Sequence, residues 1–273
     1  PDGTGLIVGI QEGMLSRLRL EPMDQSGPGK DAIWGDEEGY LSGPHLDRSR
    51  GRLLYLEQRP NLPQRLMLGE LSEDSYIGEA ITNFSKALDT DEMTPGETVT
   101  WTNDAGDTLE GLLIRAKTPG PTVVWLHGGP AEHVAHTFSP YFQALVSAGF
   151  NLFAPNYRGS TGRGDDFLRA SKGCLGIADR DDVEAGVLHL TKKGIAAPDR
   201  IALLGWSYGA TLGLRLAAKV DWVKCLVLGA PVIDLINVFG SPRYPTSMRE
   251  YFTEDWWENR AEYDAASPIS CLS

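Results

Sequence analysis

The chain has 273 residues, of which 41% are hydrophobic and 23% charged, and its formal net charge is −12. This composition is that of a globular protein, and no apolar run approaches the roughly 20 residues that a membrane helix needs. The acidic balance excludes most nucleic-acid binders, whose phosphate contacts require basic surfaces. We therefore expect neither a nucleic-acid partner nor a membrane partner.

The first residues and the cysteines allow a prediction of the cellular compartment. The first residues, Pro1-Asp2-Gly3, show no signal peptide. The cysteines are widely spaced and form no disulfide or zinc framework: Cys174, Cys225 and Cys271. We expect a reducing, cytoplasmic location.

Residues 1–88 are predicted to contain short strands joined by turns. Residues 6–10 pair with 15–20, and residues 53–57 pair with 64–68. The pattern of residues 17–20 recurs at 65–68, and a repeat of about this period, built from short strands, is typical of β-propeller blades. We predict a partial propeller of about two blades, and a coincidental meander remains the alternative.

Residues 89–97 are polar and contain Pro-Gly, which predicts a linker. From 98 to 273 we predict an α/β domain that opens with a hairpin and continues with alternating strands and helices. This order predicts a mostly parallel sheet with helices on both faces, and ligands bind such sheets at the carboxyl ends of the strands. The expected strands are 98–101, 109–114, 122–126, 151–154, 200–205 and 223–229, and the expected helices are 139–148, 179–193, 208–219 and 248–261.

Cys225 lies within the apolar strand 223–229. Free cysteine is among the residue types most often buried. We expect Cys225 to be a buried structural thiol.

A GxSxG motif follows the strand 200–205 and precedes an Ala/Leu-rich helix; it consists of Gly205, Trp206, Ser207, Tyr208 and Gly209. A sharp turn from strand to helix holds a serine hydroxyl clear of its own backbone, and flanking glycines allow other chain segments to approach. The helix N-terminus also favours developing negative charge. The motif predicts Ser207 as a nucleophile, with a tight structural turn as the alternative.

A second motif ends the earlier strand 122–126 and consists of His127, Gly128, Gly129 and Pro130. In folds with a nucleophile elbow, this loop supplies one backbone amide to an oxyanion hole, and the residue after the nucleophile supplies the other. We predict Gly129, with Gly128 beside it, and Tyr208 as these donors. A simple Gly-Gly-Pro turn is the alternative.

The series of segments 125–130, 156–164 and 205–210 resembles the motif series of the prolyl oligopeptidase family, in its acylaminoacyl-peptidase and dipeptidyl-peptidase-like branch. The acidic segment 179–183 before a helix also fits that family, and the likeness covers about residues 98–270. The resemblance implies an α/β-hydrolase fold preceded by a β-propeller. It also implies a serine peptidase that cleaves short peptides through an acyl-enzyme on Ser207, with no cofactor and no metal.

The chain departs from that family after the elbow. In the hydrolase fold, an acid and then a histidine follow the serine, whereas none of the five histidines here follows Ser207. We therefore expect a hydrolase domain that is incomplete at its C-terminal end. The readings left open are a fragment of an active peptidase, a catalytically impaired homologue, an esterase of the same fold, and a chain completed by a homo-oligomer or a complementing chain. His133 and His136 have a metal-like spacing, but we expect no metal there.

Overall fold

The computed structural model describes residues 5–23, 39–70, 78–82, 88, 90–239 and 246–272. The chain forms two compact units. The first consists of Pro1–Gly96 and Ala135–Ala144, and the second of Glu97–Val134 and Leu145–Ser273. The two units are described separately.

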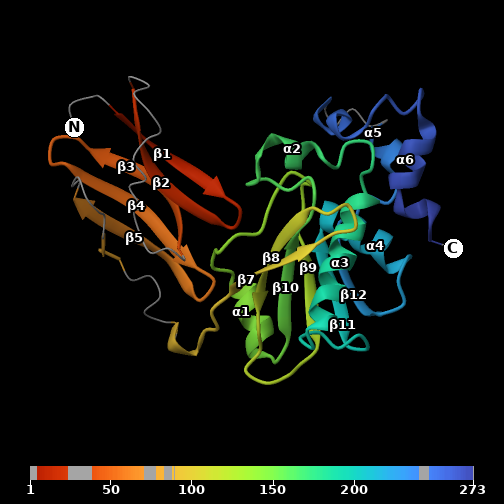
Figure 1. Cartoon of the computed structure of the whole chain (residues 1–273), viewed down its shortest axis with the longest axis horizontal. Coiled ribbons are helices and arrows are strands. Elements are labelled where there is room, and N and C mark those ends of the chain that lie inside the picture. The colour runs from red at the N-terminus through yellow and green to blue at the C-terminus, as the bar shows by residue number, and fades with distance from the viewer. Residues whose placement is uncertain are drawn as a thin grey trace. The chain divides into compact units, whose positions relative to one another are not determined.

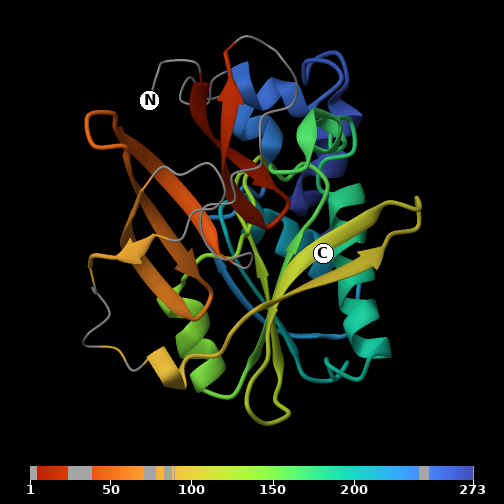
Figure 2. The same ribbon diagram turned by 60° about the vertical axis from the view of Figure 1, so that its left-hand side comes forward.

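The first unit contains one sheet with the strand order β1-β2-β3-β4-β5-β6 (Figure 2). Its strands are β1 (Gly5–Glu12), β2 (Leu15–Pro22), β3 (Tyr40–Asp47), β4 (Arg52–Arg59), β5 (Leu62–Glu70) and β6 (Glu79–Ala80). Both hairpins predicted from the sequence, β1–β2 and β4–β5, are confirmed as antiparallel pairs. The sequence did not predict β3, which pairs antiparallel with β4 and meets β2 in parallel at a single residue pair.

Alternation along β4 builds the core of the first unit. Leu53 and Tyr55 are fully buried and pack with Leu18, Leu41 and Met67. This follows from the two-residue period of a strand, which turns every second side chain to one face.

The same alternation buries a charged residue, Glu57, on the inner face of β4. Arg65, its cross-strand neighbour on β5, donates two hydrogen bonds to Glu57 Oε2, from Nε at 3.0 Å and from Nη2 at 2.7 Å. Arg59 adds an ion pair at 3.6 Å. The buried carboxylate is therefore paired, as burial of a charge requires.

A segment from the middle of the chain completes the first unit. Gln143, which is buried, donates to the carbonyl oxygens of Pro60 and Thr94, both at 2.9 Å, and accepts the Thr94 amide at 3.0 Å. The His136 amide donates to the Met14 carbonyl oxygen at 2.9 Å. Residues 135–144 are thus held in the first unit by hydrogen bonds that use all the polar groups of one glutamine.

The second unit contains a mixed sheet with the order β12-β11-β9-β10-β8-β7 (Figure 1). Its strands are β7 (Glu97–Thr102), β8 (Thr108–Ile114), β9 (Thr122–Leu126), β10 (Asn151–Asn156), β11 (Ile201–Trp206) and β12 (Val223–Gly229). The predicted hairpin β7–β8 is antiparallel, as is the pair β8–β10, whereas β10, β9, β11 and β12 run parallel. The predicted α/β class is confirmed.

Helices α3 (Ala178–Lys192) and α4 (Tyr208–Ala217) pack against each other, and together they contact β7, β9, β11 and β12. Their buried residues join those of the strands in one hydrophobic core, which includes Val183, Leu212 and Phe153. The remaining helical elements are η1 (Thr90–Glu92), α1 (Pro140–Ser147), α2 (Gly164–Arg169), α5 (Leu235–Phe239), η2 (Thr246–Tyr251), α6 (Arg260–Ala266) and η3 (Pro268–Ser270).

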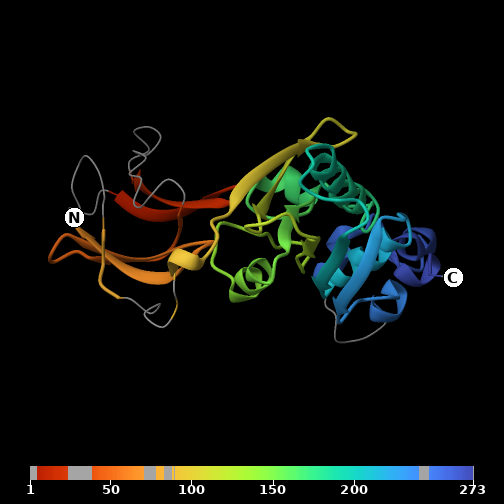
Figure 3. The same cartoon turned by 90° about the horizontal axis from the view of Figure 1, so that it is seen from below.

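Strand β12 is the edge of this sheet (Figure 3), and the expectation of a buried Cys225 is wrong. Cys225 is exposed, as are Leu226 and Val227 beside it. An apolar run in a parallel sheet is normally covered on both faces, but an edge strand lacks a neighbour on one side. The strand itself was correctly predicted, and its position in the sheet explains the error in burial.

The helix predicted at 248–261 is also wrong. The chain instead forms the short 3-10 helix η2, then turns, and begins α6 at Arg260. Thr253 gives its amide and its hydroxyl to the Glu262 carboxylate, at 3.0 and 2.5 Å, so this amide is not part of a helical ladder. Phe252 stacks on Tyr263 with the ring centroids 3.8 Å apart. Phe252 therefore packs against α6 and does not lie on the face of a helix spanning 248–261.

Candidate active site

Ser207 stands between the end of β11 and the start of α4, in a strained backbone conformation. Its φ is +53°, in the left-handed region that residues other than glycine rarely adopt. Such strain persists only where the surrounding structure enforces it, and it is concentrated at functional sites.

The two glycines of the motif are required by close approach. A Cβ at Gly205 would lie 2.7 Å from the Gly209 carbonyl carbon, and one at Gly209 would lie 2.0 Å from the Leu126 carbonyl oxygen. Both distances are far inside van der Waals contact. The glycines thus let β11 turn directly into α4 and let α4 begin against the end of β9.

The strands beside the elbow hold it in place. The Ser207 amide donates to the Gly229 carbonyl oxygen at the end of β12, at 2.9 Å. Thr211, in the first turn of α4, accepts the Val232 amide at 2.8 Å and donates to the Val232 carbonyl oxygen at 3.1 Å. These bonds fix Ser207 relative to the sheet.

Tyr208 is the first residue of α4, so its amide has no carbonyl partner within the helix. That amide lies directly after Ser207 in the chain. Trp206, on the other side of the serine, is 63% exposed, and its ring covers Gly229, where a Cβ would lie 2.2 Å from the ring.

The predicted glycine loop lies beside the elbow. A Cβ built on Gly128 would lie 3.6 Å from the Trp206 carbonyl oxygen and 3.8 Å from Ser207 Cβ. Gly129 has φ +108°, and a Cβ there would lie 2.5 Å from the Ala131 amide nitrogen, so only glycine fits. The structure therefore brings together the two motifs, which are about 80 residues apart in the sequence. The Gly129–Pro130 peptide is cis.

The buried side chain of His127 supports this loop. Its ring is buried, stacks on Tyr157 at a centroid distance of 4.2 Å, and contacts Ser160 Oγ through Nε2 at 2.9 Å. Nδ1 lies 2.9 Å from the Gly128 carbonyl oxygen, and Tyr157 OH donates to the His127 carbonyl oxygen at 2.7 Å. Burial lowers the pKa of His127 to about 4, so the ring is neutral at pH 7. Its contacts are those of a scaffold residue.

A buried carboxylate beneath the elbow was not predicted as part of the site. Asp179, at the start of α3, is fully buried, and Tyr208 OH donates to its Oδ2. The Arg180 amide donates to Asp179 Oδ1 at 2.9 Å, and Tyr208 OH accepts the Gly176 amide at 3.1 Å. Burial raises the pKa of Asp179 to about 6, against the lowering effect of the Tyr208 hydrogen bond. Asp179 thus anchors the side chain of Tyr208, the residue that follows Ser207.

A second buried acid ties the segment after β10 to α3. Asp182 accepts hydrogen bonds from Arg158 Nε at 2.8 Å, Nη2 at 2.6 Å and the Arg158 amide at 3.0 Å. Asn103 Nδ2 adds a fourth at 2.9 Å. The sequence indicated the acidic segment 179–183 as a whole, but only the fold shows that Asp179 and Asp182 turn inward while Asp181 pairs with Lys219.

The other loop histidine in this unit, His133, bonds through Nδ1 to Thr161 Oγ1 at 2.7 Å, and burial lowers its pKa. Across the described ranges, no cluster of three or more His, Cys, Asp or Glu side chains could hold a metal ion. Within those same ranges, none of the helices is both long enough and apolar enough to cross a membrane.

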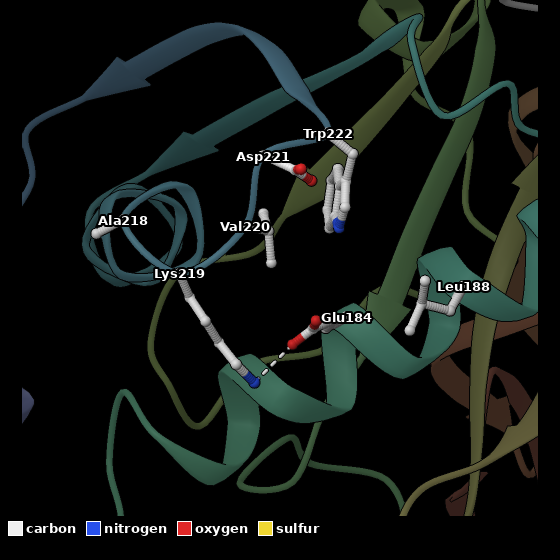
Figure 4. A pocket seen from close by; sticks show the side chains of 7 residues that line it. All are labelled: Glu184, Leu188, Ala218, Lys219, Val220, Asp221 and Trp222. Atoms are coloured by element: carbon white, nitrogen blue, oxygen red, sulfur yellow. Dashed lines mark ion pairs between the residues drawn. The ribbon is translucent and has the colours of Figure 1, made fainter.

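A groove of about 520 Å³ lies away from the elbow, beside the start of β12 (Figure 4). It is lined by Glu184, Leu188, Ala218, Lys219, Val220, Asp221 and Trp222. Lys219 is neutralised by Glu184 at 2.6 Å and Asp181 at 2.8 Å. None of these residues belongs to the serine motif, which follows the carboxyl end of β11.

Comparison with known proteins shows a sequence relationship over the part of the chain that contains Ser207. The profile of the Prolyl oligopeptidase family matches residues 136–273. The acylamino-acid-releasing enzyme of Arabidopsis thaliana is 32% identical over 193 residues, covering 61% of this chain and 25% of that protein. The enzyme of the same name from Sus scrofa is 31% identical over 147 residues, covering 52% of this chain and 20% of that protein.

Solved structures show the same fold. The acylaminoacyl peptidase of Pyrococcus horikoshii superposes with a TM-score of 0.83 over 98% of this chain and 42% of its own, at 20% identity. A puromycin-hydrolyzing peptidase of Mycobacterium tuberculosis gives 0.84 over 98% of this chain and 42% of its own, at 18% identity. The chain thus spans about a quarter or less of these two curated relatives and less than half of the solved chains.

Proposed function

The chain belongs to the prolyl oligopeptidase family, and we propose that it forms part of a serine peptidase in which Ser207 is the nucleophile. The observation that carries this proposal is the φ of +53° at Ser207, held between a strand and a helix with the Gly128–Gly129 loop alongside. A strained serine in this setting is costly as a structural turn but is what an exposed nucleophile requires.

In the proposed reaction, Ser207 Oγ attacks the carbonyl carbon of the scissile bond, and the carbonyl oxygen becomes an oxyanion. The amides of Tyr208 and Gly129 donate to that oxygen, which is the interaction that strengthens in the transition state. Collapse of the tetrahedral intermediate breaks the C–N bond as the departing nitrogen takes up the proton that Ser207 lost. The acyl-enzyme that remains is hydrolysed by water to the free acid and Ser207.

The hydroxyl proton of Ser207 must pass to a general base. The loop histidines are unsuited to this role because His127 and His133 already contact the hydroxyls of Ser160 and Thr161, and their pKa values are lowered by burial. We propose that a complementing chain supplies the base. A serine without a base keeps some rate from the oxyanion hole alone.

The first unit supports a further part of the proposal. Strands β3, β4, β5 and β6 form an antiparallel succession, which is the form of a propeller blade. We propose that residues 1–88 are part of a β-propeller that admits only short peptides to the serine.

Labelling with a fluorophosphonate probe tests the nucleophile. We expect covalent labelling that is slow at pH 7 and faster toward pH 9, because hydroxide then replaces the base, and we expect Ser207→Ala to abolish it. Gly129→Ala, which would force a Cβ against the Ala131 amide, should slow labelling with Ser207 intact.

The opposite outcomes are equally informative. Labelling that survives Ser207→Ala, or no labelling of folded protein at any pH, would overturn the role of Ser207 and favour an impaired homologue. Rapid labelling at pH 7 would place a working base within these 273 residues. Matched ester and amide substrates with the same acyl group would separate a peptidase from an esterase of the same fold.

A further inference from the structure

An acidic side chain, Glu132, lies beside the nucleophile and has no part in the chemistry described above. A Cβ built on Gly128 would lie 3.4 Å from Glu132 Oε2 and 3.8 Å from Ser207 Cβ. The carboxylate and the serine side chain therefore both border the same glycine of the loop.

The position of Glu132 is fixed by its backbone. Its amide donates to the Pro130 carbonyl oxygen at 2.8 Å, and its own carbonyl oxygen accepts the Thr161 amide at 3.0 Å. The next side chain, His133, is held by Thr161 Oγ1. The loop thus presents Glu132 rigidly, while its side chain remains exposed to solvent.

The charge of Glu132 is not neutralised within the described part of the chain. Two arginines that follow in the chain have other partners: Arg158 binds Asp182, and the Arg163 guanidinium lies over the Phe167 ring at 4.2 Å. The buried ring of His127 is neutral. Burial raises the pKa of Tyr157, and the charges of Asp179 and Glu132 raise it further. An unpaired carboxylate at the mouth of a site concentrates cations there.

We propose that Glu132 is a specificity-determining residue that selects peptides with a positively charged side chain on a residue flanking the scissile bond. The inference rests on the proposed function, because it takes the carbonyl beside Ser207 as the point from which the substrate is placed. A substrate ammonium group would find Glu132 as its partner when its carbonyl reaches the amides of Gly129 and Tyr208. An acidic side chain at the same position would be repelled.

Equilibrium binding of two dansylated tripeptide amides, Gly-Lys-Gly and Gly-norleucine-Gly, tests this without requiring any reaction. We expect the lysine peptide to bind about fivefold more tightly at low ionic strength, as a partly solvated ion pair would give. The preference should shrink as salt is added. Glu132→Gln should reduce the ratio to about one, and Glu132→Lys should invert it.

Asp199→Asn is the matched control, since Asp199 is an exposed acid just before β11, at the end of that strand opposite Ser207. It should leave the lysine preference intact. Ser207→Ala should also leave it intact, so failure of the nucleophile and failure of Glu132 are distinguishable. An equal ratio in the unaltered chain, an unchanged ratio in Glu132→Gln, or binding of neither peptide would overturn the proposal.

Discussion

Among single residues, burial shifts the pKa values of Asp179 and His127 in opposite directions. Asp179 has its pKa raised from 3.8 to about 6, so the folded state becomes less stable as pH rises through that interval and the carboxyl ionises. His127 has its pKa lowered from 6.5 to about 4, so the folded state becomes less stable as pH falls through that interval. Each effect is about 3 kcal/mol. Because the two pH intervals overlap, the effects of Asp179 and His127 on stability oppose each other.

Asp179→Asn should therefore reveal how His127 makes the free energy of unfolding depend on pH. Asparagine keeps an acceptor oxygen for Tyr208 OH but cannot ionise. We expect the free energy of unfolding of this variant to rise steeply between pH 4 and 6.5, whereas the unaltered chain changes little. Urea unfolding followed by tryptophan fluorescence across this range measures both profiles. Parallel profiles in the two proteins would contradict the assignment.

Gly209 allows a second prediction for a single residue. A methyl group at this position would meet the carbonyl oxygens of Leu126 and His127 at 2.0 and 2.5 Å. Gly209→Ala should destabilise the second unit by about 3 kcal/mol and abolish fluorophosphonate labelling, since overpacking displaces backbone.

The control is Gly9→Ala, where a Cβ would meet only a Leu18 methyl group at 4.0 Å. It should leave the thermal unfolding of the second unit unchanged. Equal effects of the two variants would show that the approach of α4 to β9 is not tight.

In the elements of secondary structure, the pairing of Glu57 with Arg65 joins β4 to β5. Removing one partner from a buried ion pair leaves an uncompensated charge. Arg65→Ala should cost about 3 kcal/mol and speed amide hydrogen exchange along β4 and β5. Arg169→Ala, which breaks an exposed pair with Asp165, should leave exchange unchanged. Unaltered protection in Arg65→Ala would indicate that Arg59 suffices for Glu57.

The sequence predicted those elements whose signal is local. Hairpins β1–β2, β4–β5 and β7–β8, and the alternation of strands and helices from β9 to β12, follow from periodicity and turn residues that lie within each segment. Strand β3 was missed because it forms through pairing with β2 and β4. Its own residues give no clear strand pattern. The supposed helix at 248–261 failed because Thr253 bonds to the Glu262 carboxylate, a contact that no helical pattern reveals.

The same distinction applies to the site. The turn at Ser207 and the 127–130 loop could be placed at neighbouring strand ends from the sequence because their glycines and the strands before them are local signals. Asp179 was not predictable, because its importance depends on contact with Tyr208, 29 residues away. Glu132 was not, because its distance from Ser207 depends on how the turn after Gly129 folds back.

At the scale of the whole molecule, β12 presents an open edge with apolar side chains on both faces. Val227 is 57% exposed and Leu226 is 42% exposed. Exposed apolar edge strands pair with other chains. Val227→Lys should therefore reduce concentration-dependent association in light scattering, while Val183→Ala, within the core, should not reduce it.

Cys225 provides an independent check of this edge. Its thiol should react with an alkylating reagent faster than the thiols of Cys174 and Cys271, which are partly buried. Cys225→Ser should remove the fast phase. Slow modification of all three thiols would mean that β12 is covered in solution.

The segment that carries Gln143 makes the two units inseparable by a single cut. It lies between β9 and β10 in the sequence, yet its hydrogen bonds serve residues 60 and 94. A recombination or cloning boundary placed near residue 96 would give an N-terminal piece without the glutamine that those backbone groups need. The other piece would carry that glutamine without its partners. The two units are therefore interleaved along the sequence, and we expect neither piece of such a cut to keep these hydrogen bonds.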